Sequence, residues 1–163
     1  MRSTSTRAIL GGFVGTVVMT AMMYMVAPMM GLNMDIARML GSMLGNSWVM
    51  GMAMHFVLGT VIFPLAYALV LYAWLPGGPV VKGATWGAIL WIVAQVVVMP
   101  MMGAGFFSMA MGGMMAAGGS LVGHLLYGSV LGGIAGPVGP RSSSTGPIGQ
   151  RRNDRDYPAQ QES

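Results

Sequence analysis

The sequence predicts an all-α integral membrane protein with four transmembrane helices, and three observations lead to that class. Hydrophobic residues make up 55% of the 163 residues, charged residues only 7%, and the mean hydropathy is +0.67. The segment 8–136 carries only three formal charges, on Asp35, Arg38 and Lys82, whereas roughly a quarter of the residues of a soluble domain are charged. Four apolar stretches in this segment are long enough to cross a bilayer.

The four predicted spans cover residues 8–30, 50–75, 83–102 and 118–136. Each is close to the length of about 20 helical residues that a hydrocarbon slab ~30 Å thick requires. The first span follows two arginines, as a signal peptide does, but its length and its proline predict a retained anchor. Residues 1–136 are therefore predicted to form one membrane domain.

The connection after the first span is predicted to contain a short interfacial helix. The apolar residues of segment 36–44 fall on one helical face, whereas Asp35 and Arg38 lie on the other. Asn33 stands at the position of an N-cap. A solvated ion pair is the expected role of Asp35 and Arg38, and a substrate contact is the alternative.

The basic residues predict the orientation. Seven of the eight lie near the two chain ends or in the turn before the third span, and Arg38 stands alone on the opposite side. The positive-inside rule then places both termini in the cytoplasm. The net charge of +4 is thus a topology signal, and no nucleic-acid partner is expected. The polar tail, residues 137–163, has little to bury and is predicted to be disordered.

Two motifs indicate an internal repeat. The segment "HFVLGTV" at 55–61 returns as "HLLYGSV" at 124–130, with the only two histidines, and "PMMG" at 28–31 returns at 100–103. The shifts are 69 and 72 residues, which one three-residue deletion reconciles. Halves at about 8–75 and 83–136 would then be two tandem hairpins in parallel, marked by Pro28 and Pro100. The connection after the third span repeats the helical spacing of apolar residues.

His55 and His124 are predicted to lie at equal depth in the membrane, and three roles are open for them. Each ring can hydrogen-bond a neighbouring helix. Two imidazoles on separate helices can also ligate a b-type haem. Copper is the third possibility, because 15 of the 20 methionines lie at 29–54 or 99–115 and thioethers suit Cu(I).

Other residues carry less specific signals. Gln95 is expected to hydrogen-bond across helices, with contact to a quinone or another ligand as the alternative. Glycines at four-residue spacing predict close helix packing, and some of these rows are expected to face another subunit or a second copy. The glycines are Gly11, Gly15, Gly83, Gly87, Gly128, Gly132 and Gly136. The spans contain no carboxylate, so an intramembrane acid–base enzyme or a proton-coupled transporter lacks its usual residues.

The stretches "MDIA", "PMMGAGFF" and His-x-x-x-Gly resemble a family of small four-span bacterial inner-membrane proteins classed as a domain of unknown function. The resemblance covers about residues 7–136 and implies the fold and a bacterial inner-membrane location. It implies no activity and no catalytic residues.

The sequence as a whole predicts a non-enzymatic accessory or scaffolding subunit of a larger membrane complex. The first alternative is a haem- or copper-binding redox subunit that uses the two histidines. A small transport protein is the second.

Overall fold

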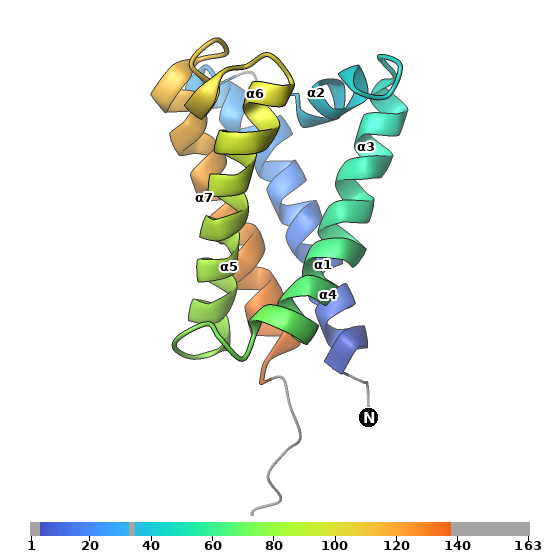
Figure 1. The fold of residues 1–163 in the computed structure, drawn as a ribbon, viewed down its shortest axis with the longest axis vertical. Coiled ribbons are helices and arrows are strands. Elements are labelled where there is room, and N and C mark those ends of the chain that lie inside the picture. Colours follow the sequence, from blue (N-terminus) through green and yellow to red (C-terminus); the bar gives the residue numbers. More distant parts are fainter. Residues whose placement is uncertain (1–3, 33–34, 138–163) are drawn as a thin grey trace, which may run out of the picture.

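In a computed structural model, which describes residues 4–32 and 35–137, the chain forms a bundle of long helices (Figure 1). Four of them are long and apolar enough to cross a membrane, and they are Thr4–Met30, Trp48–Leu71, Pro79–Met101 and Gly113–Ala135. No strand occurs in these described ranges. The predicted all-α class with four spans is therefore confirmed. The predicted disordered tail lies, apart from Pro137, outside the described residues.

The spans are built from the following elements. The first contains α1 (Thr4–Ala21), η1 (Met22–Val26) and η2 (Ala27–Met30). The second contains α3 (Trp48–Val57), η3 (Leu58–Ile62), α4 (Phe63–Ala66) and η4 (Tyr67–Leu71). The third contains α5 (Pro79–Val93), η5 (Ala94–Val98) and α6 (Met99–Met101), and the fourth is α7 (Gly113–Ala135).

Three prolines explain three of the four places where the described helices widen; η4 has no proline two residues after it. Pro28, Pro64 and Pro100 each come two residues after a π-helical segment, namely η1, η3 and η5. Proline has no N–H, and its ring clashes with the carbonyl four residues before it, so the preceding turn opens. Segments η1 and η5 are separated by the same 72 residues as Pro28 and Pro100. This agreement favours the duplication, which stays a prediction.

The two long connections lie at one end of the bundle, which we call the connection end, and the start of α1 and the end of α7 lie at the other, the terminal end (Figure 1). The first connection contains the predicted short helix, α2 (Ile36–Ser42). Its N-cap is Asp35, whose side chain accepts a hydrogen bond from the N–H of Arg38. The predicted cap, Asn33, lies outside the described residues.

The second connection does not form the helix that its apolar spacing predicts. It contains one short turn, η6 (Phe106–Ser108), before α7 begins at Gly113. Phe107 and Ser108 have positive φ angles of 51° and 57°, a backbone region that a right-handed helix cannot include. Here apolar residues at helical spacing lie in a loop. Helix α7 begins five residues before its predicted start.

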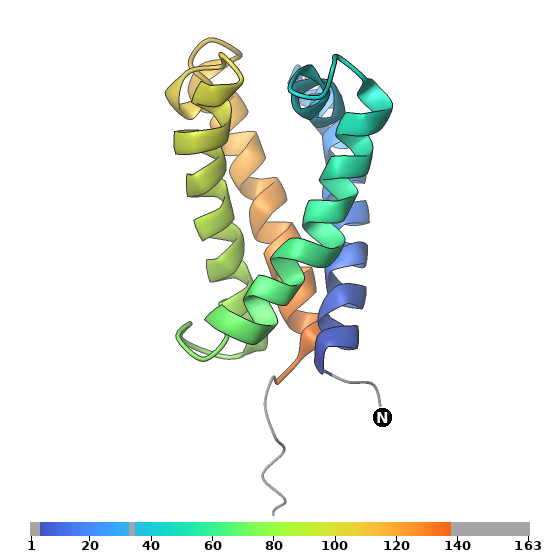
Figure 2. The same ribbon diagram turned by 45° about the vertical axis from the view of Figure 1, so that its right-hand side comes forward.

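Helix α7 packs against both α1 and α5, and Figure 2 shows it beside each of them. Glycines make these contacts close. A Cβ atom added to Gly11 or Gly15 would lie 2.9 Å from a backbone oxygen of α7, and one added to Gly83 would overlap the Gly128 carbonyl. Gly87 and Gly132 likewise face the backbone across the α5–α7 contact. The predicted packing role of these glycines therefore operates within one chain.

Gly136 departs from the predicted packing row. It ends α7 with a φ angle of 62°, and its nearest neighbour is the side chain of Arg7. Glycine is common at this position because it adopts positive φ without steric cost. Its role is to terminate the helix.

The second span is fixed to the bundle where its helix is interrupted. Pro64 gives no N–H to the turn before it, and the hydroxyl of Tyr127 on α7 donates to the carbonyl of Gly59 in that turn, at 2.7 Å. Gly12 of α1 lies against Pro64 and Gly59 so closely that a Cβ atom would overlap both. Three helices therefore meet at this point.

We expect Gly83→Ala to destabilise the protein by about 1–3 kcal/mol, the usual cost of forcing extra atoms into a packed core. The new methyl group would push α5 away from α7. Thermal unfolding in detergent measures the effect, with Gly118→Ala as the control because nothing lies within 4 Å of the added Cβ at that glycine. The control gains helix propensity of up to about 1 kcal/mol. Equal unfolding temperatures for the two variants would show that the close approach is unimportant.

Candidate functional site

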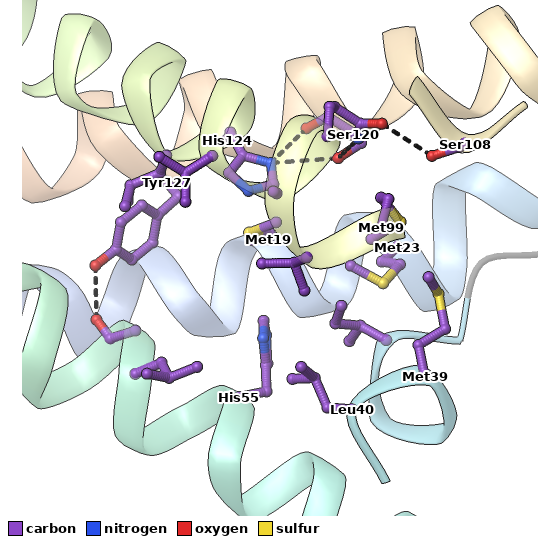
Figure 3. Close-up of a pocket in the computed structure, with 18 of the residues that line it drawn as sticks. Met19, Met23, Met39, Leu40, His55, Met99, Ser108, Ser120, His124 and Tyr127 are labelled. Atoms are coloured by element: carbon purple, nitrogen blue, oxygen red, sulfur yellow. Dashed lines mark hydrogen bonds between the residues drawn. The ribbon is translucent and has the colours of Figure 1, made fainter. Parts of the chain in front are cut away.

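A cavity of about 170 Å³ lies inside the bundle, and all four spans contribute to its wall. The first connection covers it with Ile36, Met39 and Leu40, and the second adds Ser108 and Met111. Both histidines and Gln95 line this one cavity. The structure therefore brings together the three polar residues that the sequence analysis selected, and Figure 3 shows the two imidazoles directed toward the space between them.

His55 is held by a chain of two hydrogen bonds. Its Nε2 lies 3.0 Å from Oγ1 of Thr20, and the same hydroxyl lies 2.7 Å from the carbonyl of Thr16. A hydroxyl has one proton, and when this proton is donated to the carbonyl, Nε2 of the ring donates to Thr20. The other ring nitrogen, Nδ1, then carries the free lone pair.

His124 has the opposite arrangement. Its Nδ1 lies 2.8 Å from the carbonyl of Ser120, one turn earlier in α7. A carbonyl only accepts, so Nδ1 donates and Nε2 carries the lone pair. Each ring thus has one nitrogen fixed by a protein oxygen and one nitrogen able to bind an electron-pair acceptor.

Gln95 is completely buried and connects two other elements. Its Oε1 accepts from the hydroxyl of Ser108 at 2.9 Å, and its Nε2 lies 3.5 Å from the hydroxyl of Ser120. Ser120 lies in turn 3.4 Å from Nδ1 of His124. One polar chain therefore leads from the second connection to the imidazole.

Thr20, Ser108 and Ser120 had no predicted role. Ser120 had a detectable signal, because it precedes His124 by four residues and so lies on the same helical face. Thr20 and Ser108 had none, since their partners are far away in the sequence. Only the packing of the spans places them beside His55 and Gln95.

Five methionines complete the wall of the cavity: Met19, Met23, Met39, Met99 and Met111. Three of them, Met19, Met23 and Met99, are at most 8% exposed. Their thioethers are therefore directed into the protein and away from the lipid. In the view of Figure 3, Met19 lies between the two imidazoles.

The size of the cavity distinguishes between haem and copper, the two cofactors that the histidines suggested. An apolar cavity of about 150 Å³ admits benzene, and the haem macrocycle is several times larger than benzene. The cavity of about 170 Å³ is therefore too small for haem. A bare metal ion fits. Among the described residues no group of three or more His, Cys, Asp and Glu could hold a metal, so the thioethers of Met19 and Met99, which are buried in the wall of the cavity, would have to complete the ligand set.

A second polar cluster lies at the connection end, around Asp35. Its carboxylate accepts from the hydroxyl of Tyr24 and, at 3.2 Å, from the indole N–H of Trp48. Nε of Arg38 lies 3.6 Å away, but the arginine side chain is 83% exposed, and such pairs contribute little stability. Asp35 thus joins the first span, α2 and α3, a role that the predicted ion pair with Arg38 did not include.

The chain matches one family model over residues 2–145, described as a family of unknown function, DUF6789. The chain belongs to this family. No curated protein and no solved structure gives a significant match. The family resemblance seen in the sequence is therefore confirmed, while the bacterial inner-membrane location that it implied stays a prediction.

We expect the Asp35 cluster to lose its contribution to stability in acid. Partial burial raises the pKa of the Asp35 carboxyl, but hydrogen bonds from Tyr24, Arg38 and Trp48 outweigh this effect and hold the pKa below its ordinary value of 3.8. Because the pKa is lowered in the folded state, the stabilisation is present above that ordinary value and is lost as the pH falls through the folded pKa.

Tryptophan emission between about pH 6 and about pH 3 measures this loss, with Trp48→Phe subtracted to isolate the indole beside the carboxylate. The matched control is Asp35→Asn, which keeps the size of the side chain and removes its charge. An acid transition of Trp48 that is equally large in the Asp35→Asn variant would contradict the assignment.

Proposed function

We propose that the protein is a Cu(I)-binding membrane protein, with its metal site in the cavity between His55 and His124. One observation carries the proposal: the only two histidines of the chain, from two different spans, line one small cavity together with five methionines. Thioether and imidazole groups are ligands that Cu(I) accepts, and thioethers select it over harder ions.

The hydrogen bonds around the rings support this proposal. Histidines that bind metals almost always donate their other ring N–H to a carbonyl, carboxylate or water, which fixes the ring and its tautomer. His124 has such a partner in the Ser120 carbonyl, and His55 has the hydroxyl of Thr20. Each neutral ring offers its lone pair without first losing a proton, so a cation can bind with no change in protonation.

The charge of the ligand set also suits a monovalent ion. Imidazole and thioether groups are neutral, and none of the described residues places a carboxylate in the wall of the cavity. A doubly charged ion would keep its full charge among apolar walls, at a large desolvation cost. Cu(I) carries half that charge, and soft sulfur ligands replace its hydration shell.

The orientation is part of the proposal. Lys82 and Arg7 lie at the terminal end, and the exposed Arg38 lies at the connection end. The positive-inside rule places the terminal end in the cytoplasm. The cavity, which the two connections cover, then lies toward the external side of a plasma membrane.

The expectation of an accessory or scaffolding subunit depended on glycine rows that face another protein. Gly11, Gly15, Gly83, Gly87, Gly128 and Gly132 instead contact helices of the same chain. Nothing else in the described residues favours a scaffold over a binding protein. The cavity is the more specific feature, so we base the function on it.

We expect the purified protein to bind one Cu(I) per chain, measured by competition with a Cu(I)-selective chelator and by metal analysis. His55→Ala and His124→Ala should each weaken binding by at least about 100-fold, because loss of an outer partner of a metal ligand alone costs about 10–100-fold. Thr20→Val tests such an outer partner and should fall within that smaller range.

Met114→Leu is the matched control, because that methionine is 67% exposed and lies outside the cavity. Its affinity should equal that of the unchanged protein. A protein that binds no Cu(I), or binds it equally well without either histidine, would overturn the proposed function.

A further inference from the structure

A larger chamber adjoins the cavity at the connection end. Its volume is about 600 Å³, and its wall includes the exposed Arg38 and also Asp35 and Met102. Met23, Met39 and Met111 line both the chamber and the cavity. These three side chains, which we call the shared methionines, therefore form the boundary between the two spaces.

The shared methionines come from three separate elements. Met23 belongs to η1 in the first span, Met39 belongs to α2, and Met111 lies in the second connection just before α7. They differ in exposure: Met111 is 47% exposed, Met39 is partly buried and Met23 is 7% exposed. The boundary therefore includes both exposed and buried thioethers.

The position of Met39 is fixed by the Asp35 cluster. Asp35 caps α2 and is bonded to Tyr24 of the first span and to Trp48 of α3. Helix α2 is consequently held at its N-terminus from two sides, and Met39 lies one turn further along it. The carboxylate is already satisfied by these donors and by Arg38, so it arranges the boundary and is not itself a free cation ligand.

We propose that the shared methionines form a transfer site through which Cu(I) passes from the chamber to the two histidines. This inference rests on the proposed function. Each step is an exchange of ligands: a thioether replaces a ligand of the incoming ion, and an imidazole nitrogen then replaces a thioether. Copper stays in the Cu(I) state throughout, so no oxidant or reductant is required.

The ligand chemistry favours this route over passage across the lipid. A cation that leaves water for apolar surroundings needs a donor at every position, because an unpaired charge is costly there. Thioethers are neutral and polarizable, and methionine side chains are flexible enough to follow a moving ion. Leucine has a similar size but no donor atom. In place of a shared methionine it would therefore prevent the ligand exchange while it occupies about the same volume.

The test is the double variant Met39→Leu with Met111→Leu, a volume-conserving change that usually costs less than about 1.5 kcal/mol per site. Cu(I) is supplied as a complex with a coloured chelator, and uptake and release are followed by absorbance after rapid mixing. The control is Met114→Leu with Met115→Leu, which removes two thioethers that are 67% and 68% exposed and lie outside both spaces.

We expect uptake and release to slow by the same factor, at least about tenfold, while the equilibrium affinity stays the same, because a route changes rates and not the bound state. Each single variant should slow both rates by a smaller factor, which keeps the test valid if the double variant folds poorly. The control should keep the rates of the unchanged protein.

Three results would overturn the transfer site. Unchanged uptake and release rates in the double variant, with normal binding, would rule out the transfer site and leave the proposed function intact. A loss of affinity as large as that of His55→Ala, with unchanged uptake, would make the shared methionines ligands of the bound state. Absence of Cu(I) binding by the unchanged protein would remove both proposals.

Discussion

This bundle is tightly packed where glycines let two helix backbones approach closely, and it is more open where they do not. Glycines hold α7 against both α1 and α5, and Gly12 and Gly59 hold the first span against the second. The second span and α5 meet through large rings instead, Phe63 against Trp86, with centroids 6.4 Å apart. A cavity can therefore exist beside this looser contact, and the three tight contacts keep it from collapsing.

Prolines add the second constraint. Each of the three π-helical segments that precede a proline shifts the following residues around the helix axis, and segments of this kind occur frequently at functional sites. Gln95 lies in η5, the segment before Pro100, and its side chain is completely buried. Gly59 lies in η3, where its carbonyl receives the Tyr127 hydroxyl. The interruptions of the helices thus supply polar groups at the cavity and bonds that hold its wall.

The sequence predicted most of the fold because lipid imposes one simple requirement, a run of about 20 apolar residues for each crossing. The two histidines and Gln95 also stood out, since few other polar side chains occur in the spans. The cap of α2 was less predictable, because Asn33 and Asp35 are both good N-cap residues. The loop in the second connection was not predictable, since the helical spacing of its apolar residues does not reveal the positive φ angles of Phe107 and Ser108. Most of the predicted glycines lie at close helix contacts, but spacing alone does not say which helix is the partner.

The contacts between the second and third spans matter for the membrane as an electrical insulator. At the terminal end, Phe63 lies against Trp86, and the hydroxyl of Tyr67 donates to the carbonyl of Pro79. These contacts join the second and third spans below the cavity and separate it from that face of the bundle. If the cavity holds the proposed Cu(I), this barrier would let the ion enter and leave at the connection end without carrying ionic current from one compartment to the other.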